Sequence, residues 1–211
     1  MKKITRAHLE KFLSRHTSQE RALDIGAGGS SYNRFFPNRI SIDIDPARKP
    51  DVVADAHKLP FKDHEFSLVL CTEVLEHLRD PRAAIAEMRR VLRPGGTLIL
   101  TTRFVYPLHD TPHDYWRFTK YGLEELLADW QISELIPETI DAETVAVLLQ
   151  RIGFQTRMHF NKVSKLLTFL LAYIAPVGNR IISKRFGDIK KERVEDHILA
   201  SGYYLVATPK T

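Results

Sequence analysis

Apolar residues recur with two different periods over the first hundred positions, which predicts strands alternating with helices. Short apolar runs that end in glycine, proline or aspartate are typical of buried strands. Such runs lie at 21–25, 40–44, 52–54, 66–71 and 97–101. Apolar residues spaced three and four apart predict helices at 4–16, 30–36 and 80–92. This alternation favours right-handed β-α-β units, a mostly parallel sheet and therefore the α/β class.

The link between the second and third predicted strands is unusually short. It contains only residues 44–51, including two prolines. A crossover between parallel strands normally takes about a dozen residues or more. Either its helix is reduced to a turn, or the third strand lies elsewhere.

The second half of the chain has a less regular pattern. Helices are predicted at 119–129, 141–152 and 163–182, and strands at 130–138 and 202–207. We expect a Rossmann-like domain formed by residues 1–156 and 199–211. Residues 157–198 would then be a basic, apolar helical cap or insertion.

Composition narrows the class of protein. The 211 residues suit one domain with a small elaboration, and 44% hydrophobic and 27% charged residues are ordinary soluble usage, which excludes disordered and collagen-like chains. Cys71 is the single cysteine, so the sequence excludes an internal disulfide and favours a reducing, cytoplasmic setting. Residues 1–16 lack the apolar core of a signal peptide, and the apolar run 166–177 is shorter than the roughly 20 residues of a membrane span.

A glycine turn follows the first predicted strand. The strand 21–25 runs into Gly26, Ala27 and Gly28, and glycine lets a ligand lie against the backbone where a Cβ atom would clash. No Gly-Lys-Ser/Thr follows, so the turn is not a phosphate-binding P-loop. By itself, this turn is also compatible with a purely structural role.

Carboxylates lie at the ends of the next two predicted strands. Asp43 can accept two hydrogen bonds from a ribose diol, with Asp45 as a competitor for that role. Asp55 could accept from an adenine amino group while the backbone N–H of Ala56 donates to the ring. Each is an ordinary turn aspartate when taken alone. Together with the glycine turn they mark the carboxyl-end edge of the sheet, where ligands of open α/β folds bind.

These strings resemble a known family. LDIGAGGS, SIDIDP, ADAHKLPF and FSLVLCTEVLEHLRDPRAAIAEMRRVLRPGGTLILTT are similar to the class I methyltransferases, specifically the type 11 group. The resemblance implies a Rossmann-like three-layer sandwich with a seven-stranded, mostly parallel sheet and an antiparallel last strand. It also implies S-adenosylmethionine as the cofactor.

The resemblance also implies roles for individual residues. Asp24, Gly26, Ala27 and Gly28 would frame the methionyl part of the cofactor, and Cys71 would line the site. Asp43 would bind the ribose hydroxyls, and Asp55 with Ala56 the adenine. A Rossmann dehydrogenase is the competing enzyme class, but it requires glycine where this chain has Ser31, and it does not predict Asp55.

Methyl transfer needs mainly positioning, a dry pocket and in some cases a base. His77 follows the fourth predicted strand, and His109 and His113 lie in the aromatic-rich loop 106–119 after the fifth. Because histidine titrates near neutral pH, we predict that these three handle protons for a hydroxyl acceptor. A metal could instead bind His109, Asp110 and His113, but their spacing does not define a ligand set, so no metal is predicted. A small molecule, sugar or lipid-linked glycan is the expected acceptor.

The positive charge is concentrated in one segment. Between positions 157 and 193 nine basic residues face two acidic ones, whereas the whole chain carries only +5. Peripheral contact of 162–186 with the inner face of an anionic membrane, a homodimer interface in place of a monomer, and a solvated cap all remain open. Nucleic acid is disfavoured because the basic residues alternate with aliphatic ones and not with stacking aromatics. An RNA or other nucleic-acid methyltransferase, and a non-catalytic cofactor-binding module, are the alternative functions.

Overall fold

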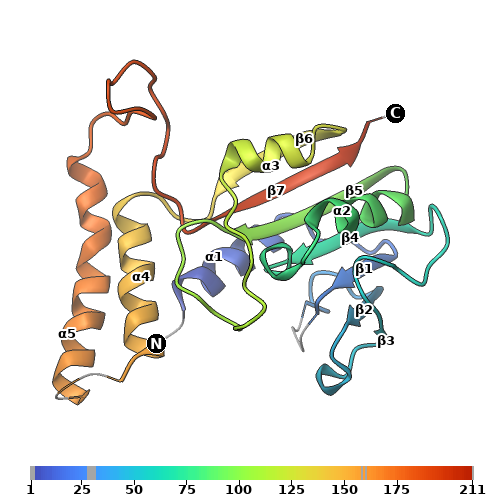
Figure 1. Cartoon of the computed structure of the whole chain (residues 1–211), viewed down its shortest axis with the longest axis horizontal. Coiled ribbons are helices and arrows are strands. Elements are labelled where there is room, and N and C mark those ends of the chain that lie inside the picture. Colours follow the sequence, from blue (N-terminus) through green and yellow to red (C-terminus); the bar gives the residue numbers. More distant parts are fainter. Residues whose placement is uncertain (1–2, 28–31, 158, 160, 211) are drawn as a thin grey trace. The chain divides into compact units, whose positions relative to one another are not determined.

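The computed structural model describes residues 3–27, 32–157, 159 and 161–210, and its seven strands form one sheet (Figure 1). The strand order is β3-β2-β1-β4-β5-β7-β6, with β7 antiparallel to the rest. The strands are β1 (Ala22–Ile25), β2 (Arg39–Asp43), β3 (Val52–Val53), β4 (Phe66–Thr72), β5 (Leu92–Arg103), β6 (Trp130–Pro137) and β7 (Gly202–Pro209). The predicted α/β class and Rossmann-like sheet are confirmed.

Five α-helices and three 3-10 helices occur in the described part of the chain. The α-helices are α1 (Ile4–Leu13), α2 (Pro81–Val91), α3 (Lys120–Leu126), α4 (Ala142–Gln155) and α5 (Asn161–Ile174). The 3-10 helices are η1 (Pro46–Arg48), η2 (Leu75–His77) and η3 (Ala175–Ile181). Helix α2 begins where local chemistry predicts, because the side chain of Asp80 accepts a hydrogen bond from the Ala83 N–H and Pro81 occupies the first turn.

The short link between β2 and β3 contains a single 3-10 turn in place of a crossover helix. Pro46–Arg48 forms only the 3-10 turn η1, and the side chain of Asp45 caps it through the Ala47 N–H at 2.9 Å. Strand β3 nevertheless pairs in parallel with β2, with Ile42 opposite Val52. The third strand therefore lies where the sequence predicted it, without a crossover helix.

Three predicted elements differ from the structure. Of the helix expected at 30–36, residues 30–31 lie outside the described residues, and Tyr32–Phe36 forms a single turn. Strand β5 begins at Leu92, five residues early, because Leu92 already pairs with Phe66 before a register shift absorbs the following turn residues. The helix expected at 163–182 changes from α5 to η3 after Ile174, since Pro176 has no N–H to donate and disfavours α geometry at the preceding residue.

The chain divides into two compact units. One contains Met1–Glu10, Phe104–Leu108 and Pro137–Gly202, and the other contains Lys11–Arg103, His109–Ile136 and Tyr203–Thr211. The second unit has a core of strand residues that are at most 2% exposed, including Leu23, Ile25, Ile42, Leu70, Leu98 and Ile99. In the first unit, α4 and α5 lie side by side (Figure 1). The segment 157–198 falls inside this first unit.

Among the described helices, none combines the length and the apolar character that crossing a membrane requires.

Candidate active site

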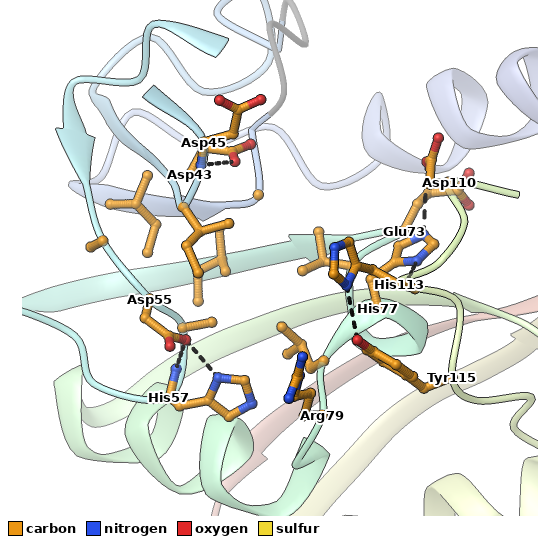
Figure 2. Close-up of a pocket in the computed structure, with 18 of the residues that line it drawn as sticks. Asp43, Asp45, Asp55, His57, Glu73, His77, Arg79, Asp110, His113 and Tyr115 are labelled. Carbon is orange, nitrogen blue, oxygen red and sulfur yellow. Dashed lines mark hydrogen bonds and ion pairs between the residues drawn. The ribbon is translucent and has the colours of Figure 1, made fainter. Parts of the chain in front are cut away.

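A cavity of about 870 Å³ opens at the carboxyl ends of the strands in the second unit (Figure 2). Residues that follow β1, β2, β3 and β4 all line it. The strand order changes direction between β1 and β4, so the cavity lies at the topological switch point of the sheet. Its lining includes Gly26, Asp43, Asp45, Asp55, Ala56, His57, Glu73, Val74, His77, Arg79, Asp80, Asp110, His113 and Tyr115.

Gly26 allows the chain to turn closely past the end of β4. Its φ is +65°, a left-handed conformation that residues with a Cβ atom rarely adopt. A Cβ atom at this position would lie 2.3 Å from Cγ2 of Val74. The position therefore requires glycine for both conformation and space.

The two aspartates at the end of β2 have different local roles. Asp43 accepts a hydrogen bond from the Asp45 N–H at 3.0 Å through Oδ1, and it lines the cavity (Figure 2). The carboxylate of Asp45 is used to cap η1. Both carboxylates line the cavity, so either one can reach a ligand diol.

Asp55 is held in place by His57. Its Oδ1 accepts from the His57 backbone N–H at 2.9 Å and lies 2.5 Å from Nδ1 of the same residue. Nε2 of His57 accepts from the Asp80 N–H at 3.2 Å, so the proton of the neutral ring lies on Nδ1. The hydrogen bond from the His57 backbone lowers the pKa of Asp55 and keeps its carboxylate charged at the cavity wall.

Several predicted cofactor residues do not line the cavity. Asp24 is fully buried and paired with Arg39 at 2.6 Å. Cys71 is also fully buried, and burial raises the pKa of its thiol. Ala27 is buried, with its N–H bonded to the Ile42 carbonyl, and Gly28 lies outside the described residues.

A second group of side chains, from η2 and the loop after β5, lies across the cavity from the aspartates (Figure 2). Nδ1 of His77 lies 2.6 Å from the His113 carbonyl oxygen and must donate to it. In neutral His77, Nε2 then carries the lone pair, 4.0 Å from a carboxylate oxygen of Asp110. Nδ1 of His113 lies 2.9 Å from the Tyr115 hydroxyl.

His109 packs behind this group and does not line the cavity. Its ring lies 4.7 Å from that of His77, and its Nδ1 lies 3.4 Å from Asp114. Burial lowers the pKa of His109 to about 4, so the ring is neutral at physiological pH. Burial alone would raise the pKa of Asp114, but two hydrogen bonds from Arg117 and one from the His109 N–H together hold that pKa at about 2.

Glu76 is a buried carboxyl group beside the histidines. Its Oε2 accepts from the Thr102 hydroxyl at 2.8 Å, while Oε1 has no hydrogen-bond partner among the described residues and lies 3.9 Å from Nε2 of His109. Burial raises the pKa of Glu76 to about 7. Atoms of Glu76, His77 and His109 that could bind a metal ion all lie within 4.8 Å of one another. This set differs from His109, Asp110 and His113, which the sequence analysis considered.

Comparisons with known proteins agree with this geometry. Residues 23–100 match the family model of a methyltransferase domain. An uncharacterized protein of Methanocaldococcus jannaschii is 36% identical over 96 residues, which cover 42% of this chain and 47% of that protein. The ubiquinone/menaquinone biosynthesis C-methyltransferase UbiE of Neisseria gonorrhoeae is 34% identical over 186 residues, which cover 75% of this chain and 73% of that enzyme. The chain belongs to the class I S-adenosylmethionine-dependent methyltransferases.

Solved structures support the fold of this methyltransferase. The [4+2]-cyclase SpnF superposes with a TM-score of 0.62 over 98% of this chain and 82% of that chain, at 16% identity. The chain spans about half the length of the Methanocaldococcus relative and about three quarters of the UbiE relative.

The cavity of the methyltransferase fits S-adenosylmethionine. Gly26 and Val74 line the cavity at the turn after β1, which we call the cradle, and a Cβ atom at Gly26 would clash with Val74 there. The carboxylates of Asp43 and Asp55 are acceptors suited to a diol and an amino group. The volume of about 870 Å³ lies within the usual range for cofactor and small-molecule pockets. When bound, S-adenosylmethionine supplies an electrophilic methyl group on a sulfonium.

Sequence reasoning missed Glu73. This residue has φ +60° directly after β4, where its N–H bonds Thr101 and its carboxylate pairs with buried Arg103. A left-handed conformation at a residue other than glycine is a costly feature that clusters at functional sites. No signal in a single sequence predicts it, because the conformation is imposed by the contacts of the folded chain.

The raised pKa of Glu76 predicts a stability effect that depends on pH. The folded pKa of about 7 exceeds the ordinary 4.5, so the fold loses stability as pH rises from about 4.5 to 7. The glutamine of Glu76→Gln is uncharged at every pH. The free energy of unfolding of this variant is expected to exceed that of the wild type by about 1–3 kcal/mol at pH 8, and by less at pH 5. Urea unfolding at both pH values measures this. Glu124→Gln, at an exposed position of α3, is the control, and an E76Q effect equal at both pH values would contradict the burial argument.

Proposed function

We propose that this methyltransferase moves the methyl group of S-adenosylmethionine to a hydroxyl oxygen of a small molecule, sugar or lipid-linked glycan. The observation that supports this is a single cavity with acceptor carboxylates on one side and His77 and His113 on the other (Figure 2). The first side suits a nucleoside, and the second suits a group that must lose a proton.

The cofactor is held by the residues after β1, β2 and β3 in this proposal. Gly26 gives the methionyl part access to the backbone, Asp43 accepts from the ribose hydroxyls, and Asp55 with Ala56 binds the adenine. Buried Asp24, Ala27 and Cys71 support this side of the cavity from behind without lining it, and Gly28 is proposed to contact the methionyl part.

His77 is the proposed general base. The His113 carbonyl fixes its tautomer, which leaves the lone pair of Nε2 available at the cavity wall. An acceptor hydroxyl at hydrogen-bond distance from Nε2 would lose its proton to that atom. Bound S-adenosylmethionine would supply the methyl group, and its sulfur would leave as the thioether of S-adenosylhomocysteine. His109 positions the His77 ring through the contact at 4.7 Å, and His113 holds Nδ1.

Asp43→Ala is expected to weaken binding of S-adenosylmethionine by about 1–3 kcal/mol, because charge-assisted hydrogen bonds are lost. Asp45→Ala removes the cap of η1 and is expected to weaken binding less. Calorimetric titration with S-adenosylhomocysteine compares the two variants. An unchanged dissociation constant for D43A would remove Asp43 from the site.

The acceptor and the methylated atom need a direct experiment. The UbiE relative is by name a C-methyltransferase, and a phenol-type hydroxyl that loses its proton can react at carbon or at oxygen. Incubation with methyl-labelled cofactor and glycan, lipid, phenol and RNA acceptors, followed by mass spectrometry and NMR of the product, distinguishes these cases. A labelled ether carbon supports the proposal, a methylated ring carbon or a labelled RNA contradicts it, and cofactor binding without any product favours a non-catalytic module.

We also propose that residues 157–198 form a basic helical insertion on the Rossmann-like domain. Limited proteolysis within 157–198, followed by cofactor titration of the nicked protein, tests this boundary. Retained binding supports an insertion that is separable from the cofactor site, and lost binding contradicts it.

A further inference from the structure

Helix α5 buries small and polar side chains and exposes large apolar ones. Thr168 and Ala172 are only 9% and 3% exposed, and Phe169 packs against Phe154 of α4 with ring centroids 5.2 Å apart. The outward side chains form what we call the α5 face, and each is between 49% and 82% exposed: Val163, Leu166, Leu167, Leu170, Leu171, Tyr173 and Ile174. A contiguous apolar patch of this kind marks an interaction surface.

The apolar surface continues past the end of α5. Val177 and Ile181 of η3 are 54% and 86% exposed. The α5 face and η3 therefore present nine large apolar side chains within 19 consecutive residues. Exposing so many apolar side chains to water is unfavourable, which indicates that another surface covers them in the functional state of the protein.

The sequence segment that carries the α5 face and η3 has charges of one sign only. No aspartate or glutamate occurs between positions 144 and 187, whereas seven lysines and arginines do. Lys162 and Lys165 lie on α5 and Arg180 on η3, and none of the three pairs with an acidic group in the described part of the chain. The surface that covers this face must therefore tolerate or attract positive charge.

These observations favour a lipid surface over a second copy of the chain. A homodimer formed through the α5 face would bring two segments of like positive charge together, which opposes association. A short helix with an exposed apolar face and a basic residue beside it, here Lys162, is the pattern of helices that lie in the plane of a membrane interface. At 14 residues, α5 is suited to lie on a bilayer and not to cross it.

We propose that the α5 face and η3 dock onto the surface of an anionic lipid membrane. The apolar side chains enter the interface, and the exposed Lys162 and Arg180 meet the anionic headgroups. This binding is independent of the proposed methyl transfer, so the two are tested separately.

Co-sedimentation of the full chain with lipid vesicles tests the proposal. Vesicles of phosphatidylcholine mixed with phosphatidylglycerol should bind the protein, with weaker binding as salt is added, and vesicles of phosphatidylcholine alone should bind it less. Leu167→Ser with Leu170→Ser should lower the partition coefficient by about tenfold or more, because two apolar anchors are lost. Lys162→Ala with Arg180→Ala should lower it by about tenfold on the anionic vesicles only.

Tyr121→Ser is the matched control, since Tyr121 is a 58% exposed aromatic residue on α3 in the other unit. It should bind vesicles like the wild type, and thermal unfolding verifies that every variant is folded. Failure of the wild type to bind anionic vesicles would overturn the proposal, as would equal binding by L167S/L170S. A wild-type dimer that L167S/L170S converts to a monomer, with no change in vesicle binding, would assign the face to self-association instead.

Discussion

Gly26→Ala is expected to weaken binding of S-adenosylmethionine by about a hundredfold or more, the largest effect of any single substitution in the cofactor cavity. The left-handed conformation at φ +65° costs a residue with a Cβ atom about 1–2 kcal/mol. The new methyl group would also stand 2.3 Å from Cγ2 of Val74, so the turn after β1 or the end of β4 must move. Either movement narrows or displaces the cradle, and each 1.4 kcal/mol of lost fit is about a tenfold loss of affinity.

Gly95 provides a matched control for the cost of placing a Cβ atom on a left-handed backbone. It has φ +75°, but a Cβ atom there would meet nothing within 4 Å. Gly95→Ala should therefore lose some stability and keep its affinity for the cofactor. Combining Gly26→Ala with Val74→Ala removes the clash and should recover part of the affinity. If G26A binds S-adenosylhomocysteine as tightly as the wild type, the cradle is not at Gly26.

His77→Asn is expected to lower kcat by about 10²–10⁴ while leaving cofactor affinity unchanged, which is the usual contribution of a general base. Asparagine can place a donor where Nδ1 stood, so the hydrogen bond to the His113 carbonyl can persist. It has no equivalent of Nε2, so the proposed proton acceptor is lost. Steady-state kinetics on the acceptor found in the screen, with a calorimetric titration in parallel, separates chemistry from binding.

The pH profile distinguishes a base from a structural histidine. The acidic limb of the wild-type profile should disappear in H77N, and higher pH should partly restore its rate, because the acceptor then ionises without help. His16→Asn is the control, since His16 pairs with Glu134 and does not line the cavity. Full activity in H77N, or a parallel loss of affinity and rate, would contradict the assignment.

Elements whose signals are local were predicted well. Asp80 and Pro81 start α2 through a cap that needs only neighbouring residues. Buried strands such as β4 are apolar runs bounded by turn residues, so their positions follow from composition alone. The early start of β5 at Leu92 could not be predicted, because it depends on pairing with Phe66, 26 positions earlier in the chain.

The sequence predicted the part of the candidate site that depends on sheet topology, and missed the part that depends on tertiary contacts. Asp43 and Asp55 follow strands that end at one edge of the sheet, so topology alone brings them to the cavity. The pairing of Asp24 with Arg39 and of Asp114 with Arg117 depends on tertiary contacts, and neither was foreseen. In the sequence, Glu76 is only one residue of the EVLEH string that resembles the family. The structure shows that it is buried beside His109 and that its pKa is raised.

Calorimetric titration of the purified chain with S-adenosylmethionine and S-adenosylhomocysteine, with NAD as the control, tests the central claim most directly. The cavity at the ends of β1, β2 and β4 predicts micromolar binding of the first two compounds and no binding of NAD, because the chain has Ser31 where a dinucleotide turn requires glycine. Absence of binding by both sulfur compounds would contradict a working cofactor site and leave only the fold assignment.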